Sequence, residues 1–348
     1  MKTKLFSILF FFTAFLQSQT LEKGKNYYVS AIGFWNVENL YDTLNDPKKI
    51  DEEFLPDGVN AWTGKRYWEK INHMSKVIAE MATDATPEGL SILGLCEIEN
   101  KNCLDDLVKD PQLKSRNYQT ILVDGPDARG VDPGLIYNPK HFKVTKVATY
   151  RVTLPTDSAH KTRDQLVVSG SLFGEALTII VNHWPSRRGG ELASRPNRIE
   201  AAKVCRRIAD SVTKLDPNNK VIIMGDLNDD PPNESVKTHL KTYGRLKDVK
   251  EDYYFNPMEA LYKQGIGTLA WQDSWNLFDQ TILNKTLLPS GYKSFQYYKA
   301  VVFNKPYLKS DFGNFKGYPF RTYSGGTYTA GYSDHFPVYV ILVKEQVK

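Results

Sequence analysis

The chain alternates short apolar runs with longer segments of helical periodicity, and several of the apolar runs end in a polar side chain. Apolar runs of about four to eight residues bounded by turn signals are typical of buried strands, whereas apolar residues at helical spacing indicate amphipathic helices. We therefore predict an α/β fold. The predicted strands are 28–36, 90–96, 118–123, 134–137, 142–152, 165–173, 176–182, 221–225, 278–283 and 338–343, and the predicted helices are 68–81, 104–108 and 196–215, the last beginning at Pro196.

The N-terminus has the layout of a secretory signal. Lys2 and Lys4 precede an apolar run, and small or polar residues follow around Ser18. The apolar run is too short to span a bilayer, and no later stretch is long enough to do so. We expect residues 1–19 to be a signal peptide and the mature protein to be periplasmic or secreted, with no transmembrane segment. A buried N-terminal strand or helix is the alternative, and the charge pattern favours export.

Charge and cysteine content constrain the partners only weakly. The formal net charge is +5, and loss of Lys2 and Lys4 with the signal leaves +3, which is too small to demonstrate a polyanionic partner. The three cysteines lack the paired spacing of a zinc site. We interpret them as buried thiols, with a bridge between two of them as the open alternative. Nothing implies a stable protein partner, so we expect a monomer.

Five of the apolar runs end in side chains that suit metal binding or proton transfer. In α/β proteins the ends of strands gather polar groups at one edge of a sheet. The side chains at these endings are Asn36, Glu97, Asn182, His183, Asp226, Asn228, Asp334 and His335. Any one of them alone is weak evidence, because a carboxylate at a strand end is ordinarily solvated and a lone histidine is more often structural. Asp226 and Asn228 are more specific, since side chains two positions apart in extended chain point the same way.

Taken together, the motifs NVENL, LCEIEN, NHWPSR, GDLND and SDHFPV follow one another in an order and spacing that resemble the endonuclease/exonuclease/phosphatase superfamily. This superfamily contains DNase I and the exonuclease III-like repair nucleases, and the resemblance extends over roughly residues 31–340 to a secreted bacterial member. It implies a four-layer α/β/β/α sandwich of two packed mixed β-sheets flanked by helices. Residues 20–348 would then form a single catalytic domain with its active site at one end of the sandwich.

The resemblance also implies roles for the polar side chains. Asn36 and Glu97 would hold Mg²⁺, or alternatively Mn²⁺ or Ca²⁺, through the oxygen ligands that such cations prefer, and Asp334 would complete the metal site. The catalytic residues would be His183, Asp226, Asn228, Asp279 and His335. In this scheme Asp226 and Asn228 orient the attacking water, and Asp279 orients His335. Which histidine is the acid and which is the base stays open at this point.

Further side chains are candidates for contact with the substrate. The segments DARGVDPGLIYNP and TRDQLVVSGSL are similar to family segments that contact phosphate, which makes Tyr137 and Arg163 candidates. Arg187 and Arg188 follow the motif histidine and suit phosphate binding, although arginines on a turn are commonly only solvated. Residues 284–332 are rich in Tyr, Phe, Lys and Gly, and either form a long surface excursion that carries specificity or pack their aromatic rings on one another.

The resulting hypothesis is a secreted, divalent-metal-dependent endonuclease whose partner is DNA or RNA. Arg187, Arg188 and aromatic residues suited to base stacking, such as Tyr297, Tyr298 and Tyr323, favour this hypothesis. The first alternative is a phosphoesterase that acts on a lipid headgroup or an inositol phosphate. A catalytically inactive binding module is the second alternative, and the complete set of motif residues argues against it.

Overall fold

The computed structural model describes residues 21–346, so the expected signal peptide at 1–19 lies outside the described residues. All ten predicted strands are present. Six strands form one mixed sheet in the order β14-β17-β1-β2-β4-β3, in which β1 runs parallel to β2 and antiparallel to β17. Their bounds are β1 (Tyr27–Leu40), β2 (Leu90–Ile98), β3 (Gln119–Leu122), β4 (Asp132–Tyr137), β14 (Gln296–Val302) and β17 (Val338–Glu345).

The second sheet has seven strands in the order β5-β6-β7-β8-β13-β10-β9. It is also mixed, because β7 and β8 are parallel whereas β13 is antiparallel to β8. Its strands are β5 (Phe142–Tyr150), β6 (Gln165–Leu172), β7 (Glu175–His183), β8 (Lys220–Asp226), β9 (Thr242–Tyr243), β10 (Tyr254–Phe255) and β13 (Asp279–Leu283). Two short hairpins lie outside both sheets, β11 (Leu269–Trp271) with β12 (Ser274–Asn276) and β15 (Tyr323–Ser324) with β16 (Thr327–Tyr328).

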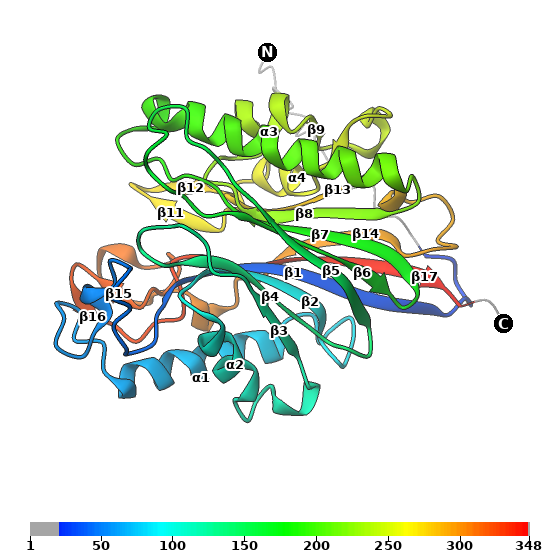
Figure 1. The fold of residues 1–348 in the computed structure, drawn as a ribbon. Helices are drawn as coiled ribbons and strands as arrows, with labels where there is room; N and C mark the ends of the chain where they lie inside the picture. The colour runs from blue at the N-terminus through cyan, green and yellow to red at the C-terminus, as the bar shows by residue number, and fades with distance from the viewer. Residues whose placement is uncertain (1–20, 347–348) are drawn as a thin grey trace, which may run out of the picture.

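The two sheets pack face to face around an apolar core (Figure 1). Ile32 and Phe34 of β1 pack in one buried cluster with Ile179 of β7 and Met224 of β8. Gly94 of β2 permits a close approach of the sheets, because a Cβ there would lie 2.6 Å from the sulfur of Met224. Further apolar clusters lie on the outer face of each sheet, so the strands are buried on both sides, which explains why they read as nearly continuous apolar runs in the sequence.

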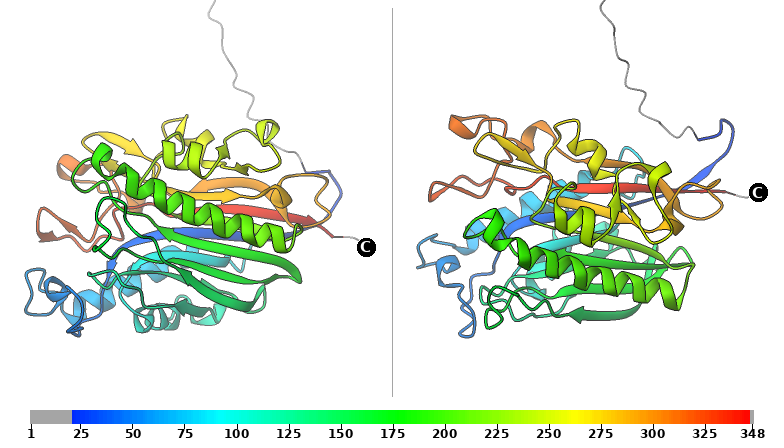
Figure 2. Two further views of the ribbon diagram at one scale, coloured as in Figure 1. Left: turned by 45° about the horizontal axis from the view of Figure 1, so that its top comes forward. Right: turned by 90° about the horizontal axis from the view of Figure 1, so that it is seen from above.

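Helices cover the two outer faces. The helices α1 (Gly64–Glu80) and α2 (Lys101–Lys109) pack on the six-stranded sheet, and α3 (Glu191–Leu215) lies across the seven-stranded sheet (Figures 1 and 2). A short helix, α4 (Met258–Tyr262), follows β10. The predicted four-layer α/β/β/α sandwich is therefore confirmed. None of the described helices is long and apolar enough to cross a membrane.

Two expectations about particular segments need correction. Helix α3 begins at Glu191 rather than at Pro196, because Arg195 pairs with Glu191 at 3.0 Å and the buried Arg198 donates to the Glu191 carbonyl. The proline then removes only one hydrogen bond near the start of the helix. The stretch 284–332 is not wholly a surface excursion, since β14 within it pairs with β17 at the edge of the six-stranded sheet.

The aromatic rings of this stretch pack on one another and on the rest of the protein. Tyr332 contacts the rings of Tyr307 and Phe320, and Tyr323 contacts the rings of Tyr328 and Trp62. The sequence left open whether this stretch is a surface excursion or packs its aromatic rings on one another, and these rings pack on one another. All three cysteines are free and buried, so the alternative of a bridge between two of them is wrong.

Candidate active site

Strand register gathers three of the predicted residues at one end of the seven-stranded sheet. The parallel pairing of β7 with β8 places His183 opposite Asp226, and the antiparallel pairing of β13 with β8 places Asp279 opposite the same Asp226. All three side chains are buried. His183 and Asp279, almost one hundred positions apart in sequence, therefore lie on either side of Asp226.

Two more predicted residues lie at the corresponding end of the six-stranded sheet. Asn36 of β1 pairs with Cys96 of β2, so Glu97 follows one position beyond it. Both strands have irregular register at this point, and Glu97, Glu38 and Asn39 have φ values of 64°, 53° and 55°. Left-handed backbone at residues other than glycine is strained, and such strain gathers at functional sites. Because of this irregularity, Glu97 does not follow the regular alternation of side-chain directions along β2.

Direct contacts join the two sheets at this end. The Asn36 amide donates to Asp226 Oδ2 at 3.1 Å. His183 Nε2 lies 3.7 Å from both Glu97 Oε1 and Asp226 Oδ2. The side chains of Asn36, Glu97, His183 and Asp226 therefore form one cluster, as the sequence predicts.

The loop before β17 adds His335 to this cluster. Its Nδ1 lies 2.7 Å from Asp279 Oδ2, and its Nε2 lies 4.0 Å from Asp226 Oδ2. The loop is held in place because the Trp35 indole donates to the His335 carbonyl at 2.9 Å and Ser333 Oγ donates to the Asn36 carbonyl at 2.7 Å. Asp279 thus fixes the ring of His335 and leaves its Nε2 facing the centre of the site.

The two histidines have opposite electrostatic environments. Burial lowers the pKa of His183 well below its usual value, and the guanidinium groups of Arg163 and Arg129 lower it further. Burial also lowers the pKa of His335, but Asp279, with Asp334 and Asp226, outweighs that effect and raises it well above the usual value. Burial likewise raises the pKa of Asp226 to about 6, with a further contribution from Asp279. The site therefore holds carboxylates that are crowded and poorly solvated.

Asn228 supports the cluster through both its backbone and its side chain. Its N–H donates to Asp226 Oδ1 at 2.9 Å, and its amide donates to the Trp184 carbonyl at 3.0 Å. Its backbone is left-handed, with φ of 49°. Asp226 and Asn228 therefore lie together in the turn that follows β8, as predicted from their spacing.

The donor set fits a hard divalent cation. Asn36, Glu97 and Asp226 present oxygen atoms on facing sheet ends, and Mg²⁺ and Mn²⁺ prefer oxygen ligands of this kind. Within residues 21–346, Glu97 Oε1 accepts no hydrogen bond and Asp279 Oδ1 is buried without a partner. Asp334 lies at the margin of the cluster, 3.9 Å from His335 Nε2, and pairs with Arg321 at 2.6 Å.

The structure does not bring Tyr137 to the site. β4 runs antiparallel to β2, so Tyr137 pairs with Ile92, whereas Asp132 at the start of β4 pairs with Ile98 beside Glu97. Tyr137 packs edge-on against Phe142 instead. About five residues of extended chain, roughly 16 Å, separate the pairing partner of Tyr137 from Glu97.

Of the three predicted arginines, two are held by internal contacts. Arg163 is buried near His183 and donates to Asp127 Oδ2 and the Trp184 carbonyl. Arg187 donates to the Asn228 carbonyl, pairs with Asp229 at 3.1 Å, and lies over the ring of Phe278. Only Arg188 is exposed on the turn that follows β7.

Two arginines beside the site were not predicted. Arg129 precedes β4, pairs with Asp127, and is close enough to Glu97 and Asp127 that their charges raise its pKa against the effect of burial. Arg321 precedes β15 and lies between Asp334 and Glu38. The segment around Arg129 was already notable in the sequence for its similarity to family segments. For Arg321 the sequence offers no signal, because its place depends on how the stretch 284–332 folds back.

A model of the Endonuclease/Exonuclease/phosphatase family matches residues 31–344. The chain belongs to this family. Members of the superfamily are phosphoesterase hydrolases that generally use divalent metals. A search of curated protein sequences finds no significant match.

Several solved structures of the superfamily share the fold. A family protein from Bacteroides thetaiotaomicron is 15% identical, with a TM-score of 0.54 and coverage of 92% of this chain and 97% of that one. The mannosyl-6-phosphatase Bt3783 of the same organism is 17% identical, with a TM-score of 0.53 and coverage of 90% and 99%. TDP2 from D. rerio, complexed with a single-strand DNA product, is 17% identical, with a TM-score of 0.53 and coverage of 90% and 98%. At these identities the likeness shows the fold alone.

Proposed function

We propose that the protein is a divalent-metal-dependent phosphoesterase that hydrolyses its substrate by attack of water on phosphorus. The observation that carries this proposal is the convergence of Asn36, Glu97, His183, Asp226 and His335 from both sheets onto one point. Attack of water on a phosphoester needs positioned water, neutralised phosphate oxygens and a stabilised leaving group. The cluster offers a group for each of these needs.

The proposed roles follow from the contacts. Asn36 and Glu97 hold the cation, with Asp334 at its margin, and the cation neutralises charge on the phosphate when it is bound. Asp226, braced by Asn228, orients the attacking water. His335, held by Asp279 through Nδ1, presents Nε2 to a phosphate oxygen. His183 presents its Nε2 from the opposite side of Asp226 and stabilises the departing oxygen.

For the specific activity within the phosphoesterases, the first candidate is a secreted nuclease that acts on DNA or RNA. The fold is that of TDP2, whose structure contains a DNA product, and Arg129 and Arg188 add positive charge at the end of the sandwich that holds the site. Other features weaken the nucleic-acid hypothesis. Arg187 is tied to Asp229, and Tyr297 packs against Phe255 rather than forming a surface on which bases could stack.

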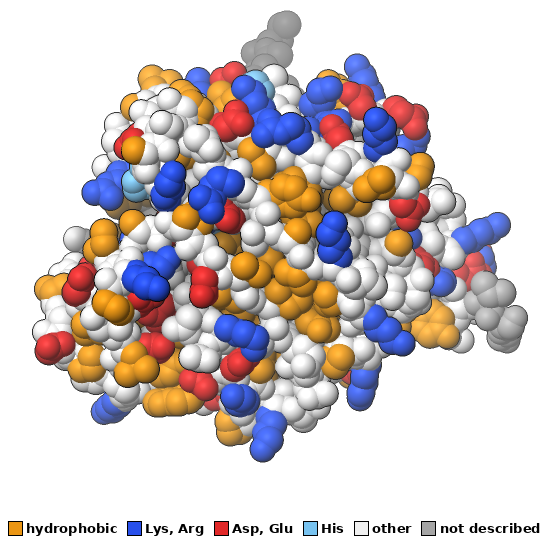
Figure 3. All heavy atoms as spheres, viewed as in Figure 1, with side chains coloured by type: hydrophobic (Ala, Val, Ile, Leu, Met, Phe, Trp, Pro, Cys, Tyr) orange, Lys and Arg blue, Asp and Glu red, His pale blue; other side chains and the backbone are white. Residues whose placement is uncertain are grey.

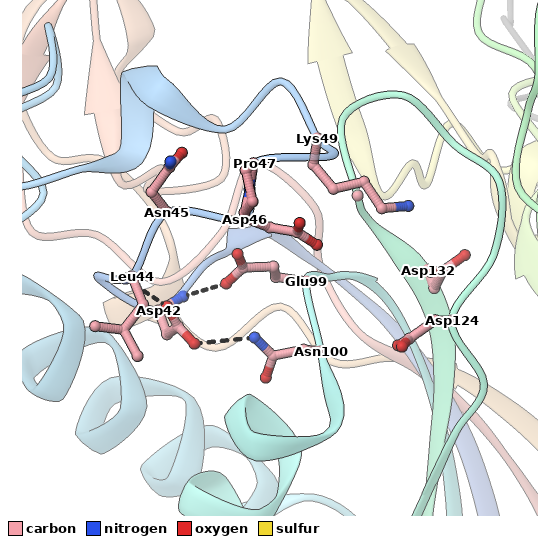
Figure 4. Close-up of a pocket in the computed structure, with 11 residues that line it drawn as sticks. Asp42, Leu44, Asn45, Asp46, Pro47, Lys49, Glu99, Asn100, Asp124 and Asp132 are labelled. Carbon is pink, nitrogen blue, oxygen red and sulfur yellow. Dashed lines mark hydrogen bonds between the residues drawn. The ribbon is translucent and has the colours of Figure 1, made fainter.

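A phosphoesterase for a small substrate is the second candidate, and the charge of the nearby surface favours it. A cavity of about 300 Å³ is lined by five carboxylates, Asp42, Asp46, Glu99, Asp124 and Asp132, and by Lys49 (Figure 4). Lys49 donates to backbone carbonyls rather than to these carboxylates. On the face shown in Figure 3, Lys and Arg side chains are scattered among acidic and apolar ones and form no continuous stripe. A polyanion gains little from such a surface.

Hydrolysis assays with the mature protein test both candidates. Closed plasmid DNA, single-stranded RNA, sphingomyelin and an inositol phosphate are each incubated with Mg²⁺ and with EDTA. Nicking of plasmid or cleavage of RNA that needs Mg²⁺ would establish the nuclease, whereas phosphate or headgroup release would establish the second candidate. Glu97→Ala and His335→Ala abolish either activity, and the exposed Glu251→Gln serves as the control. Absence of hydrolysis from every substrate would contradict the proposal.

A further inference from the structure

The cavity lined by five carboxylates contains a group of side chains close enough together to share a cation. One carboxylate oxygen of Asp42, one of Glu99 and the sulfur of Cys103 all lie within 4.8 Å of one another. Two oxygens that bind the same Ca²⁺ at about 2.4 Å can lie up to about 4.8 Å apart, so one ion can bridge Asp42 and Glu99. This group shares no residue with the proposed catalytic site.

Two more carboxylates come from the segment that follows Asp42. Asp46 lines the cavity, and its N–H donates to Asp51 Oδ2 at 2.8 Å. Burial is the main cause that raises the pKa of Glu99 to about 8. The charges of Asp42, Asp51 and Asp46 add to this shift, and the Asp42 N–H opposes it. The four carboxylates are therefore close enough to repel one another, and we call Asp42, Asp46, Asp51 and Glu99 the Asp42 cluster.

Asp51 has a buried carboxylate oxygen without a partner. The residue is only 1% exposed, and its Oδ1 accepts no hydrogen bond from the described residues. Within residues 21–346, no member of the Asp42 cluster forms an ion pair with Lys, Arg or His. Burying a carboxylate without a paired charge is costly. The fold therefore gathers negative charge here that a bound cation would balance.

The other side of the cavity already has a positive charge. In Figure 4, Asp46 and Glu99 lie on one side of the cavity, and Asp124 and Asp132 lie on the other. Lys49 donates to backbone carbonyls of the segment before β4, and its charge opposes the raised pKa of Asp132. The described residues give the Asp42 cluster no such positive neighbour. A cation is therefore best placed on the side of Asp46 and Glu99.

The donor set favours Ca²⁺ over other divalent cations. Asp42 and Asp46 lie in irregular chain, as does Asn45, which also lines the cavity. Ca²⁺ accepts about six to eight oxygens in irregular geometry, whereas Mg²⁺ needs a nearly ideal octahedron. Burial raises the pKa of the Cys103 thiol well above its usual value, and the charge of Glu99 adds to this. The sulfur therefore stays protonated and does not act as a ligand for a softer metal.

We propose that the Asp42 cluster binds a structural Ca²⁺ ion, which holds the loop 42–51 against the end of β2. The loop already contacts β2 here, because the Asp42 N–H donates to Glu99 Oε2 at 2.6 Å and the Asn100 amide donates to Asp42 Oδ2 at 2.9 Å. Glu99 lies two positions after Glu97, so the ion would stabilise the chain beside the catalytic cluster. The proposal does not depend on which substrate the protein hydrolyses.

Titration calorimetry and thermal melts with CaCl₂ alone test this proposal. The parent protein is Glu97→Gln, which lacks the charged oxygen of the proposed catalytic metal site. Asp46→Asn and Asp51→Asn are introduced into it one at a time. Each asparagine can keep the hydrogen bond that its carboxylate accepts, from the Lys48 N–H or from the Asp46 N–H. We expect each substitution to raise the Kd for Ca²⁺ at least about tenfold, because one charged ligand is lost.

The melting temperature should follow the same pattern. Ca²⁺ raises it in the parent protein, because the ion binds the folded state, and raises it much less in Asp46→Asn and Asp51→Asn. In EDTA, Asp51→Asn should melt no lower than the parent, since the substitution removes a buried repelling charge. The control is Asp57→Asn, an exposed aspartate in the same connection between β1 and α1 that does not line the cavity. It should respond to Ca²⁺ as the parent does.

Other outcomes overturn the proposal. Equal Ca²⁺ affinity in the parent, Asp46→Asn and Asp51→Asn would show that the cluster does not bind the ion. The same conclusion follows if wild type binds Ca²⁺ and Glu97→Gln does not, because the ion would then lie at the catalytic site. A response to Zn²⁺ but not to Ca²⁺ would require the Cys103 sulfur as a ligand and would also overturn it. In each case the proposed phosphoesterase function is unaffected, because the hydrolysis assays test it separately.

Discussion

His335 Nδ1 lies 2.7 Å from Asp279 Oδ2, and both side chains are buried where the ends of the two sheets meet. His335 precedes β17 of the six-stranded sheet, whereas Asp279 opens β13 of the seven-stranded sheet. The pair therefore ties the two halves of the sandwich together at the proposed site. A carboxylate that accepts from Nδ1 fixes the ring orientation and leaves Nε2 as the atom facing the substrate.

Replacing Asp279 with Asn should reduce kcat on the order of 10²- to 10³-fold with a smaller effect on KM. The amide keeps the size of the side chain but no longer stabilises a protonated or correctly oriented imidazole. Steady-state kinetics on whichever phosphoester is hydrolysed, together with circular dichroism to establish folding, measure the effect. A folded Asp279→Asn variant with wild-type kcat would show that the pair is only structural.

Glu97→Gln should weaken Mg²⁺ or Mn²⁺ binding at least about tenfold, because a neutral amide replaces the charged oxygen that faces the cluster. Titration calorimetry with the metal alone measures this affinity and requires no substrate. The matched control is Glu251→Gln, an exposed glutamate paired with Lys285 away from the site. Equal metal affinity in wild type and Glu97→Gln would place the cation elsewhere.

Much of the site follows from sequence because its residues sit at strand ends. The apolar runs before Asn36, Glu97, His183 and Asp226 identify buried strands, and buried parallel strands bring their carboxyl ends to one edge. The resemblance then supplies the order of the motifs. The four-layer sandwich could be predicted on the same basis.

What the sequence could not reveal depends on strand direction and on loop packing. Tyr137 ends a strand as Glu97 does, but β4 runs antiparallel to β2, so the end of β4 lies at the other edge. Arg187 is of a residue type that commonly contacts phosphate. In the folded protein, however, it contacts Asp229 and Phe278, which are distant from it in sequence. Arg321 lies beside the site in a segment that Lys70 and Glu38 bind at Thr322, and both partners are far from it in sequence.

The contacts of Arg187 predict a role in stability rather than in substrate binding. Arg187→Ala removes hydrogen bonds to the Asn228 carbonyl and Asp229 and a ring contact with Phe278, which should cost about 1–3 kcal/mol. The exposed Arg188→Ala should change the free energy of unfolding by less than about 0.5 kcal/mol. Denaturant unfolding measures both values. An Arg187→Ala variant of unchanged stability but raised KM would restore Arg187 as a substrate contact.

Because Asp132 is buried, we expect the free energy of unfolding to depend on pH. Burial raises the pKa of its carboxyl group from 3.8 to about 6, and Asp127 and Asp124 add to the effect while the Gly125 N–H and Lys49 oppose it. The folded protein therefore binds this proton more tightly than the unfolded chain. Stability from this group is present below about pH 4, falls as the pH rises through 6, and stays low above it.

Asp132→Asn should consequently be more stable than wild type by about 1–2 kcal/mol at pH 8, and the difference should vanish near pH 4. The amide oxygen can still accept the Gly125 N–H, which donates to Asp132 at 2.8 Å. Urea unfolding at both pH values, in EDTA so that no divalent cation offsets the charge, measures the difference, with the exposed Asp311→Asn as control. If the free energy of unfolding differs between Asp132→Asn and wild type by the same amount at pH 4 and pH 8, the substitution acts through packing and not through the buried charge.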